Sequence, residues 1–241
     1  MKHVHRSLYY AAVFLIFIPF WPILFILRKK SDKYYSTFVN IRKKIALTAS
    51  SLVGFKYQIH WEEEVDWSRN YIICANHTSN LDITAMINVC QHDFSFIGKD
   101  ELLANPVTGL FFRTIDIPIK RTSKMSSFRA FRRAQEYLGE GKSIVIFPEG
   151  GIGEDYPPVL DPFKNGVFKL AVDLNLPILP VVIEDAWKVF WDDGAKKGSK
   201  PGTVHIRVLK PIEGEDLTKG ANELRDKVYD LFKRNLNSTR P

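Results

Sequence analysis

The chain has 241 residues, of which 45% are hydrophobic and 25% are charged, which is typical of a globular protein with one sizeable core. It has two cysteines, Cys74 and Cys90, which match no metal or redox spacing and argue against a disulfide framework. The formal net charge of +7 favours an anionic partner, which by composition alone is a nucleic acid, a membrane surface or an acidic carrier.

The first predicted element is an apolar helix over Leu8–Leu27, a stretch of twenty residues without a charge. A helix of that length spans about 30 Å, the thickness of the hydrocarbon core of a bilayer. The stretch runs directly into Arg28, Lys29 and Lys30, whereas a cleaved signal peptide ends at small residues. Two prolines inside it predict a kinked helix.

An amphipathic helix is predicted next, over 33–53, because apolar residues recur at helical spacing between Tyr34 and Leu52 with lysines between them. Such a helix suits the headgroup region of a bilayer, and the alternative is a helix packed on the soluble core. We expect residues 1–55 to be an N-terminal membrane anchor that dips into one leaflet, with a true span as the alternative. The basic flank that follows the apolar helix predicts that the remaining chain lies on the cytoplasmic face of the cell membrane.

The remainder, 56–241, alternates short apolar runs with helical stretches, without a repeat or a clear linker. This pattern predicts a single α/β domain, with a mixed, largely parallel sheet flanked by helices. The expected strands are Lys56–Trp61, Tyr71–Ala75, Phe94–Ile97, Ile144–Phe147, Ile178–Ile183 and Val204–Leu209, and the expected helices lie near 81–90, 123–139, 164–175 and 217–236.

The first candidate site follows the strand Tyr71–Ala75, where Asn76 and His77 precede Asp82. Ligands and catalytic groups usually lie in the loop after the carboxyl end of such a strand. A carboxylate five residues later, in the first helical turn, can hold one imidazole nitrogen as a donor and leave the other free to accept a proton. The structural alternative is a helix-capping pair formed by Ser79 and Asp82.

A second candidate block, Phe147-Pro148-Glu149-Gly150, also follows an apolar strand. There a carboxylate beside a flexible glycine can approach a polar head group closely, although the same residues also make an ordinary turn. Between the two blocks, Lys99 and Arg121 are cations suited to a phosphate, and the alternative is solvated surface.

Taken in order, these blocks resemble the glycerolipid acyltransferase family, typified by bacterial 1-acylglycerol-3-phosphate acyltransferase. The resemblance covers about residues 50–212, and the ordered set is far more specific than any member of it. The matching blocks are Asn76-His77-x4-Asp82, Gly98-Lys99 leading to a strand that ends at Arg121, Phe147-Pro148-Glu149-Gly150, and Leu176–Val182 with Pro180. The segment Pro162–Gly166 also looks like the family's segment between the last two blocks.

The resemblance implies a reaction without a cofactor or a metal, in which acyl-CoA or acyl-carrier protein is the acyl donor. His77 would be the general base on the acceptor hydroxyl and Asp82 would orient it. Lys99 and Arg121 would bind the acceptor phosphate, and Glu149 with Gly150 would shape the glycerol site. The expected acceptor is the lyso-lipid 1-acylglycerol-3-phosphate, which gives phosphatidic acid in phospholipid biosynthesis.

The chain departs from the family at Gly151-Ile152, where members commonly have Thr-Arg. Because that Arg is a natural phosphate clamp, Lys164 or Lys169 would have to compensate, or the acceptor would differ. The alternative functions are O-acylation of a lyso-aminolipid, of the glycine or ornithine lipid type, and transacylation between phospholipids. A non-enzymatic alternative is a membrane-anchored lipid-binding module with a basic segment at Lys124–Arg133; nucleic acid is not an expected partner.

Overall fold

The computed structural model describes residues 2–192 and 196–237. Its helices are α1 (Lys2–Leu27), α2 (Tyr35–Leu52), α3 (Leu81–Val89), α4 (Thr108–Phe112), α5 (Lys124–Gly139), α6 (Gly166–Leu174), α7 (Ala186–Val189), α8 (Glu215–Thr218) and α9 (Ala221–Asn237), with the 3-10 helices η1 (Arg28–Lys30) and η2 (Asp100–Ala104). Its strands are β1 (Phe55–Trp61), β2 (Ile72–Ala75), β3 (Phe94–Lys99), β4 (Ile117–Ile119), β5 (Ser143–Ile146), β6 (Ile178–Ile183), β7 (Phe190–Asp192), β8 (Lys197–Ser199) and β9 (Gly202–Val208).

In the described part of the chain, the main sheet has seven strands in the order β1-β9-β6-β2-β5-β3-β4. Every neighbouring pair is parallel except β6 and β9, which are antiparallel. The central strands β2 and β6 are buried at every position, as expected for strands that are covered on both faces. The expected mixed, largely parallel sheet flanked by helices is therefore confirmed.

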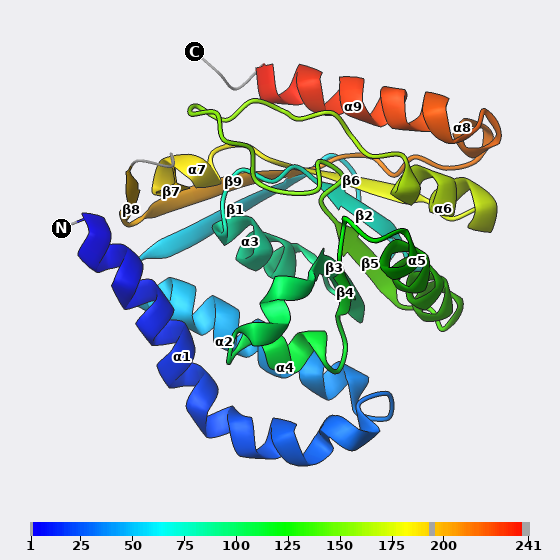
Figure 1. Ribbon diagram of the computed structural model, residues 1–241. Coiled ribbons are helices and arrows are strands. Elements are labelled where there is room, and N and C mark those ends of the chain that lie inside the picture. The colour runs from blue at the N-terminus through cyan, green and yellow to red at the C-terminus, as the bar shows by residue number, and fades with distance from the viewer. Residues whose placement is uncertain (1, 193–195, 238–241) are drawn as a thin grey trace.

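Helices cover both faces of the sheet (Figure 1). Figure 1 shows α6 and α9 above the sheet and α2 and α3 below it, while α5 lies beside β5. The helix α1 lies along one side of the molecule, in contact with α2 and with the β7–β8 hairpin. This arrangement leaves the carboxyl ends of β2 and β5 next to each other, because these two strands are parallel neighbours.

The helix α1 begins at Lys2, earlier than the expected Leu8, and contains both Pro19 and Pro22. Figure 1 shows the kink that the prolines predict, because the blue ribbon curves along its length. The charged first turns stay helical because Arg6 donates to the backbone oxygen of Trp191, at 2.7 Å. A tertiary partner therefore extends the helix beyond its apolar stretch.

One stripe of α1 is buried and most of the rest faces outward. Tyr9, Phe17 and Leu24 are buried, at spacings of eight and seven residues. By length and composition, α1 with η1 is the one stretch of the described chain that could cross a membrane. The exposed large apolar side chains of α1 are Val4, Leu8, Tyr10, Phe14, Leu15, Ile18, Trp21, Ile23, Phe25 and Ile26.

Candidate active site

His77 and Asp82 form a hydrogen-bonded pair at the carboxyl end of β2. His77 lies in the loop that follows β2, and Asp82 lies in the first turn of α3. The distance between Nδ1 of His77 and Oδ2 of Asp82 is 3.0 Å, and the two side chains are 14% and 0% exposed. With Nδ1 donating to the carboxylate, Nε2 of His77 is left as the proton acceptor.

The carboxylate of Asp82 also organises the loop that carries His77. Its Oδ2 atom accepts hydrogen bonds from the backbone N–H groups of Thr78, at 2.6 Å, and Ser79, at 2.8 Å. The other oxygen, Oδ1, is buried and has no hydrogen-bond partner among the described residues. The Ser79–Asp82 contact of the structural alternative and the contact with His77 therefore use the same oxygen, Oδ2 of Asp82.

The ring of His77 is held from its other side by Phe147. The two rings stack with their centroids 4.1 Å apart and an angle of 20° between their planes. Phe147 directly follows β5, and the pairing of Cys74 with Ile146 sets the ends of β2 and β5 side by side. Two motifs that lie seventy residues apart in sequence meet because their strands are parallel neighbours.

Glu149 connects this pair to the loop before α6. One carboxylate oxygen accepts from the backbone N–H of His77, at 2.6 Å, and the other accepts from the backbone N–H of Asp161, at 3.0 Å. The residue is 7% exposed, and burial raises the pKa of its carboxyl to about 8, against the lowering effect of the two backbone hydrogen bonds. Because both oxygens are engaged by the backbone, the geometry favours a positioning role over the expected contact with the acceptor.

The remaining motif residues fix the ends of the central strands. The side-chain amide of Asn76 donates to the backbone oxygen of Ile183 and accepts from its N–H, at 2.9 and 2.7 Å. Pro180 is buried in β6 opposite Cys74, and the backbone oxygen of Pro148 accepts from the N–H of Lys164. These contacts are structural and hold β2, β6 and the loop after β5 in place.

A cleft of about 300 Å³ lies beside Phe147, and two cations line it. Arg121 and Lys164 are both in its wall, together with Gly150, whose φ of +88° favours glycine. A side chain at Gly150 would collide with the end of Lys164, and one at Gly151 would lie 3.3 Å from a guanidinium nitrogen of Arg121. The glycines thus let both cations approach the loop that replaces the family's Thr-Arg.

Sequence reasoning placed Lys99 in this group, but the residues that line the cleft do not include it. Lys99 is exposed at the end of β3, opposite Ile119 of β4. Lys164 takes part instead, and Lys169 is also absent from the lining. The signal for Lys164 was its place in the segment Pro162–Gly166, which resembles the family, and with Lys169 it was one of two expected substitutes for the missing Arg. No cluster of three or more His, Cys, Asp or Glu side chains that could hold a metal ion occurs within the described residues.

Comparison with known proteins identifies the family of this chain. The sequence model of the family described as Acyltransferase matches residues 56–184. This chain belongs to that acyltransferase family. The match includes His77, Asp82, Arg121 and Glu149 and ends in the residue after β6.

Several curated relatives have similar sequences. The chain is 30% identical over 205 residues to the human 1-acyl-sn-glycerol-3-phosphate acyltransferase alpha. This alignment covers 81% of this chain and 70% of the relative. It is 30% identical over 184 residues to an uncharacterized acyltransferase from Schizosaccharomyces pombe. That alignment covers 76% of this chain and 64% of the relative. For a chloroplastic relative from Brassica napus, named a 1-acyl-sn-glycerol-3-phosphate acyltransferase, the chain spans 57% of its length.

The fold also matches a solved structure along nearly all of both chains. The crystal structure of the 1-acyl-sn-glycerophosphate acyltransferase from Thermotoga maritima has a TM-score of 0.77 and covers 99% of this chain and 98% of its own. At 22% sequence identity, this likeness establishes a shared fold. The shared fold extends through α1 and α2, which lie outside the matched family model.

Proposed function

We propose that this protein transfers a fatty acyl group from acyl-CoA or acyl-carrier protein to the free hydroxyl of 1-acylglycerol-3-phosphate and so makes phosphatidic acid. The observation that carries the proposal is the His77–Asp82 pair beside a cleft with two cations. The names of the curated human and Brassica napus relatives support the choice of acceptor.

In the proposed reaction, His77 acts as a general base. Its Nε2 atom takes the proton from the acceptor hydroxyl while the hydroxyl oxygen attacks the thioester carbonyl. The new carbon–oxygen bond forms, the carbon–sulfur bond breaks, and the proton passes from His77 to the leaving sulfur. Asp82 keeps Nδ1 protonated and stabilises the imidazolium that forms between these steps. The reaction requires no acyl-enzyme.

The acceptor phosphate is proposed to bind between Arg121 and Lys164. The two cations line the same cleft, from the segment after β4 and the segment before α6. Charged hydrogen bonds from a guanidinium and an ammonium suit a phosphate, and together they replace the Arg that the family has at Ile152. Glu149 is proposed to hold the His77 loop and the Asp161 loop at a fixed separation, so it acts through its neighbours.

Residues 1–55 are proposed to anchor the α/β domain, 56–241, to one leaflet of the membrane. The chain is tied to that domain at both ends of α1: Arg6 and His5 contact Trp191 and Ser199, and Asp32, in the turn after α1, contacts Arg133. A helix that crossed the bilayer would carry its first residues about 30 Å away, to the other side. The ties at both ends of α1 therefore support an anchor that lies in one leaflet, and the basic run Arg28–Lys30 supports placing the domain on the cytoplasmic face.

The experiment that tests the proposal measures acyl transfer by the purified protein in vesicles, with lysophosphatidate and with two lyso-acceptors that lack a phosphate monoester. Each acceptor is offered with acyl-CoA and with acyl-carrier protein, and the lipid products are identified by mass spectrometry. We expect phosphatidic acid as the main product. Faster acylation of a lyso-aminolipid, or acyl exchange between phospholipids without a thioester, would contradict the proposed acceptor or donor.

A further inference from the structure

A second cleft, of about 420 Å³, lies between α4, α5 and β4. It shares no lining residue with the cleft beside Phe147. Ser126, Ala130 and Arg133 of α5 line the second cleft, whereas Ser127 and Phe131 line the first. Because residues three and four apart share one helix face, the two clefts open on different faces of α5. We call the second one the arginine cleft.

Three guanidinium groups, those of Arg113, Arg129 and Arg133, line the arginine cleft. Arg129 is exposed and has no hydrogen bond or ion pair with any side chain or backbone group that the structure describes. Arg113 is also exposed, and the one hydrogen bond of its guanidinium in the described chain is to the backbone oxygen of Leu103, at 2.6 Å. Two of the three guanidinium groups are thus without a carboxylate partner within residues 2–192 and 196–237.

Two carboxylates, those of Asp116 and Asp100, also line the arginine cleft, and they differ in how far they neutralise the positive charge of its guanidinium groups. Asp116 is buried and already paired with the guanidinium of Arg42, at 2.6 Å, and it also accepts from the backbone N–H of Phe96. Asp100 begins η2 and faces the cleft with no ion pair to a described residue. The balance of the exposed side chains is positive, which suits an anion with several acceptor oxygens.

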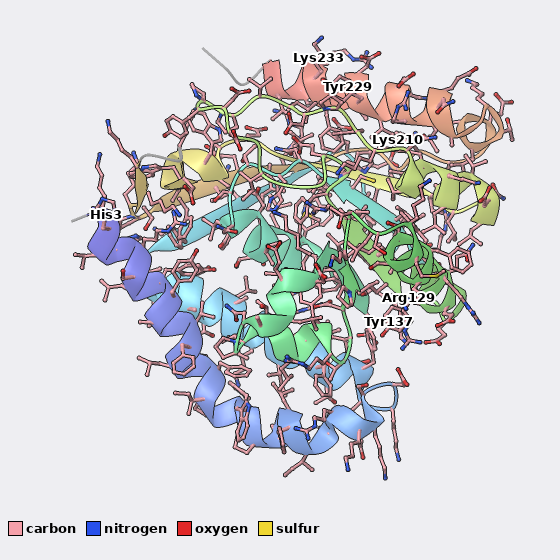
Figure 2. All side chains as sticks on the ribbon, in the orientation of Figure 1. His3, Arg129, Tyr137, Lys210, Tyr229 and Lys233 are labelled. Carbon is pink, nitrogen blue, oxygen red and sulfur yellow. The ribbon has the colours of Figure 1, made fainter. Side chains whose placement is uncertain are left out.

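The arginine cleft lies next to the turn between the two anchor helices. Arg133 contacts Asp32 in that turn, at 3.3 Å, and the ring of Tyr137 packs edge-on against Tyr35 at the start of α2, with centroids 5.4 Å apart. Figure 2 labels Arg129 and Tyr137 on α5, on the side of the molecule where this turn lies. The turn also contains the basic run Arg28–Lys30. Any lipid surface that contacts α1 and α2 is therefore close to the cleft.

From these contacts we propose that the arginine cleft binds the phosphate of an anionic phospholipid head group, at a site separate from the reacting pair. Exposed guanidinium groups of Arg113 and Arg129 donate to the phosphate oxygens, and the basic run in the turn adds attraction toward an anionic leaflet. The site shares with the proposed function the placement of α1 and α2 at the bilayer. It does not depend on the reaction, because head-group binding requires no turnover.

Calorimetry on the full chain in uncharged detergent tests this site, with short-chain phosphatidylglycerol as the probe. In the Arg113→Gln/Arg129→Gln variant we expect affinity to fall about tenfold or more, because two charge-assisted hydrogen bonds to the phosphate are lost. Arg132→Gln is the matched control, since Arg132 lies on the same helix, is exposed and does not line the cleft. It should bind the lipid as the wild type does, and unchanged melting temperatures would show that the variants are folded.

Further probes separate the possible sources of the phosphate. Inorganic phosphate and adenosine 3′,5′-bisphosphate, the phosphate-bearing nucleotide of CoA, are titrated into the same proteins. If the nucleotide binds more tightly than the lipid and loses affinity in the double variant, the cleft serves the acyl donor and the lipid assignment is overturned. Equal lipid affinity in all variants overturns the site. Loss of lipid binding in Arg121→Gln/Lys164→Gln with retention in Arg113→Gln/Arg129→Gln would place the lipid in the cleft beside Phe147, which also overturns it.

Discussion

Within residues 2–192 and 196–237, two His–Asp pairs are hydrogen-bonded through their side chains, and their surroundings differ more than their geometry does. In the first, Nδ1 of His77 lies 3.0 Å from Asp82; in the second, Nδ1 of His205 lies 2.7 Å from Asp185. The exposed fractions of the two histidine side chains are 14% and 45%, and those of the aspartates are 0% and 19%. By distance alone, the second pair is the tighter one.

The first pair is distinguished by what surrounds it. Oδ2 of Asp82 accepts two backbone N–H groups, and the ring of His77 stacks on Phe147, which lines a cleft with two cations. Neither pair lines a cleft itself: His77 is joined to one through its stacking on Phe147, whereas His205, within β9, stacks on no described residue that lines either cleft. A paired imidazole becomes a useful base only where a substrate can approach it in a fixed orientation. Substitutions at matched positions of the two pairs test this difference.

The largest expected effect is that of His77→Ala. Removing a general base should lower kcat roughly 10²–10⁴-fold, because the variant loses Nε2, the atom that accepts the proton of the acceptor hydroxyl. Acyl transfer from labelled acyl-CoA to lysophosphatidate measures this, and flotation with vesicles should show intact membrane binding. His205→Ala is the matched control and should keep wild-type kcat. Turnover that survives in His77→Ala would reject the assigned base.

Asp82→Asn should have the next largest effect. The amide cannot accept three hydrogen bonds on one charged oxygen, so His77 loses its fixed tautomer, and kcat should fall by roughly 10²-fold or more. The variant combined with His77→Ala should lose little further activity, since the two side chains act as one unit. Asp185→Asn, in the second pair, should leave kcat unchanged. Equal losses in the two Asn variants would remove the distinction between the pairs.

Smaller effects are expected from the cations that mark the first pair's cleft. Arg121→Gln and Lys164→Gln should each raise KM for lysophosphatidate about tenfold, because each removes a charged hydrogen bond to the phosphate. Steady-state kinetics with an acceptor that lacks the phosphate monoester should show little change. Lys169→Gln, an exposed lysine on α6 outside the cleft, serves as the control. A fall in kcat with an unchanged KM would contradict the assignment of these cations to the acceptor.

The smallest expected effect on turnover is that of Glu149, whose raised pKa acts on stability instead. Its pKa in the folded protein is about 8, against an ordinary value of 4.5, so its contribution to stability is fully present below about pH 4.5 and is lost as the pH rises through 8. The amplitude is on the order of 4 kcal/mol. Denaturant unfolding between pH 5 and pH 9 should show a shallower fall with pH for Glu149→Gln than for the wild type. Exposed Glu154→Gln is the control, and identical slopes for all three proteins would contradict the raised pKa.

Most main strands are predictable from sequence, because their side chains report burial directly. The apolar run Ile178–Ile183 was expected as a strand and is β6, and the other expected strands agree with the structure to within two residues at each end. The short strands β7 and β8 were not expected, and β4 was expected only through the family resemblance, as a strand that ends at Arg121 rather than at Ile119. Each has three residues, too few for a periodic pattern, and each exists because a neighbouring strand supplies its hydrogen bonds.

Sequence reasoning also merged two helices near the end of the chain. The expected helix 217–236 is divided into α8 and α9, and Gly220 between them has a φ of +94°. A residue with a positive φ cannot continue a right-handed helix, so the helix is interrupted at Gly220. The neighbouring Lys219 does not by itself indicate that interruption. The apolar periodicity of the sequence predicted α9, whereas the conformation of Gly220 determines that α9 begins at Ala221.

By itself, the sequence determined the α/β class, the apolar helix and the identity of the His77–Asp82 pair, because burial patterns and a five-residue spacing are local properties of the chain. Only the tertiary structure decided which residues share a cleft. The parallel pairing of β2 and β5 brings Phe147 to His77, buries Glu149 between two loops, and leaves Lys99 outside the cleft that Arg121 and Lys164 line. These contacts join segments far apart in the chain, so they depend on strand order and packing rather than on spacing along the chain.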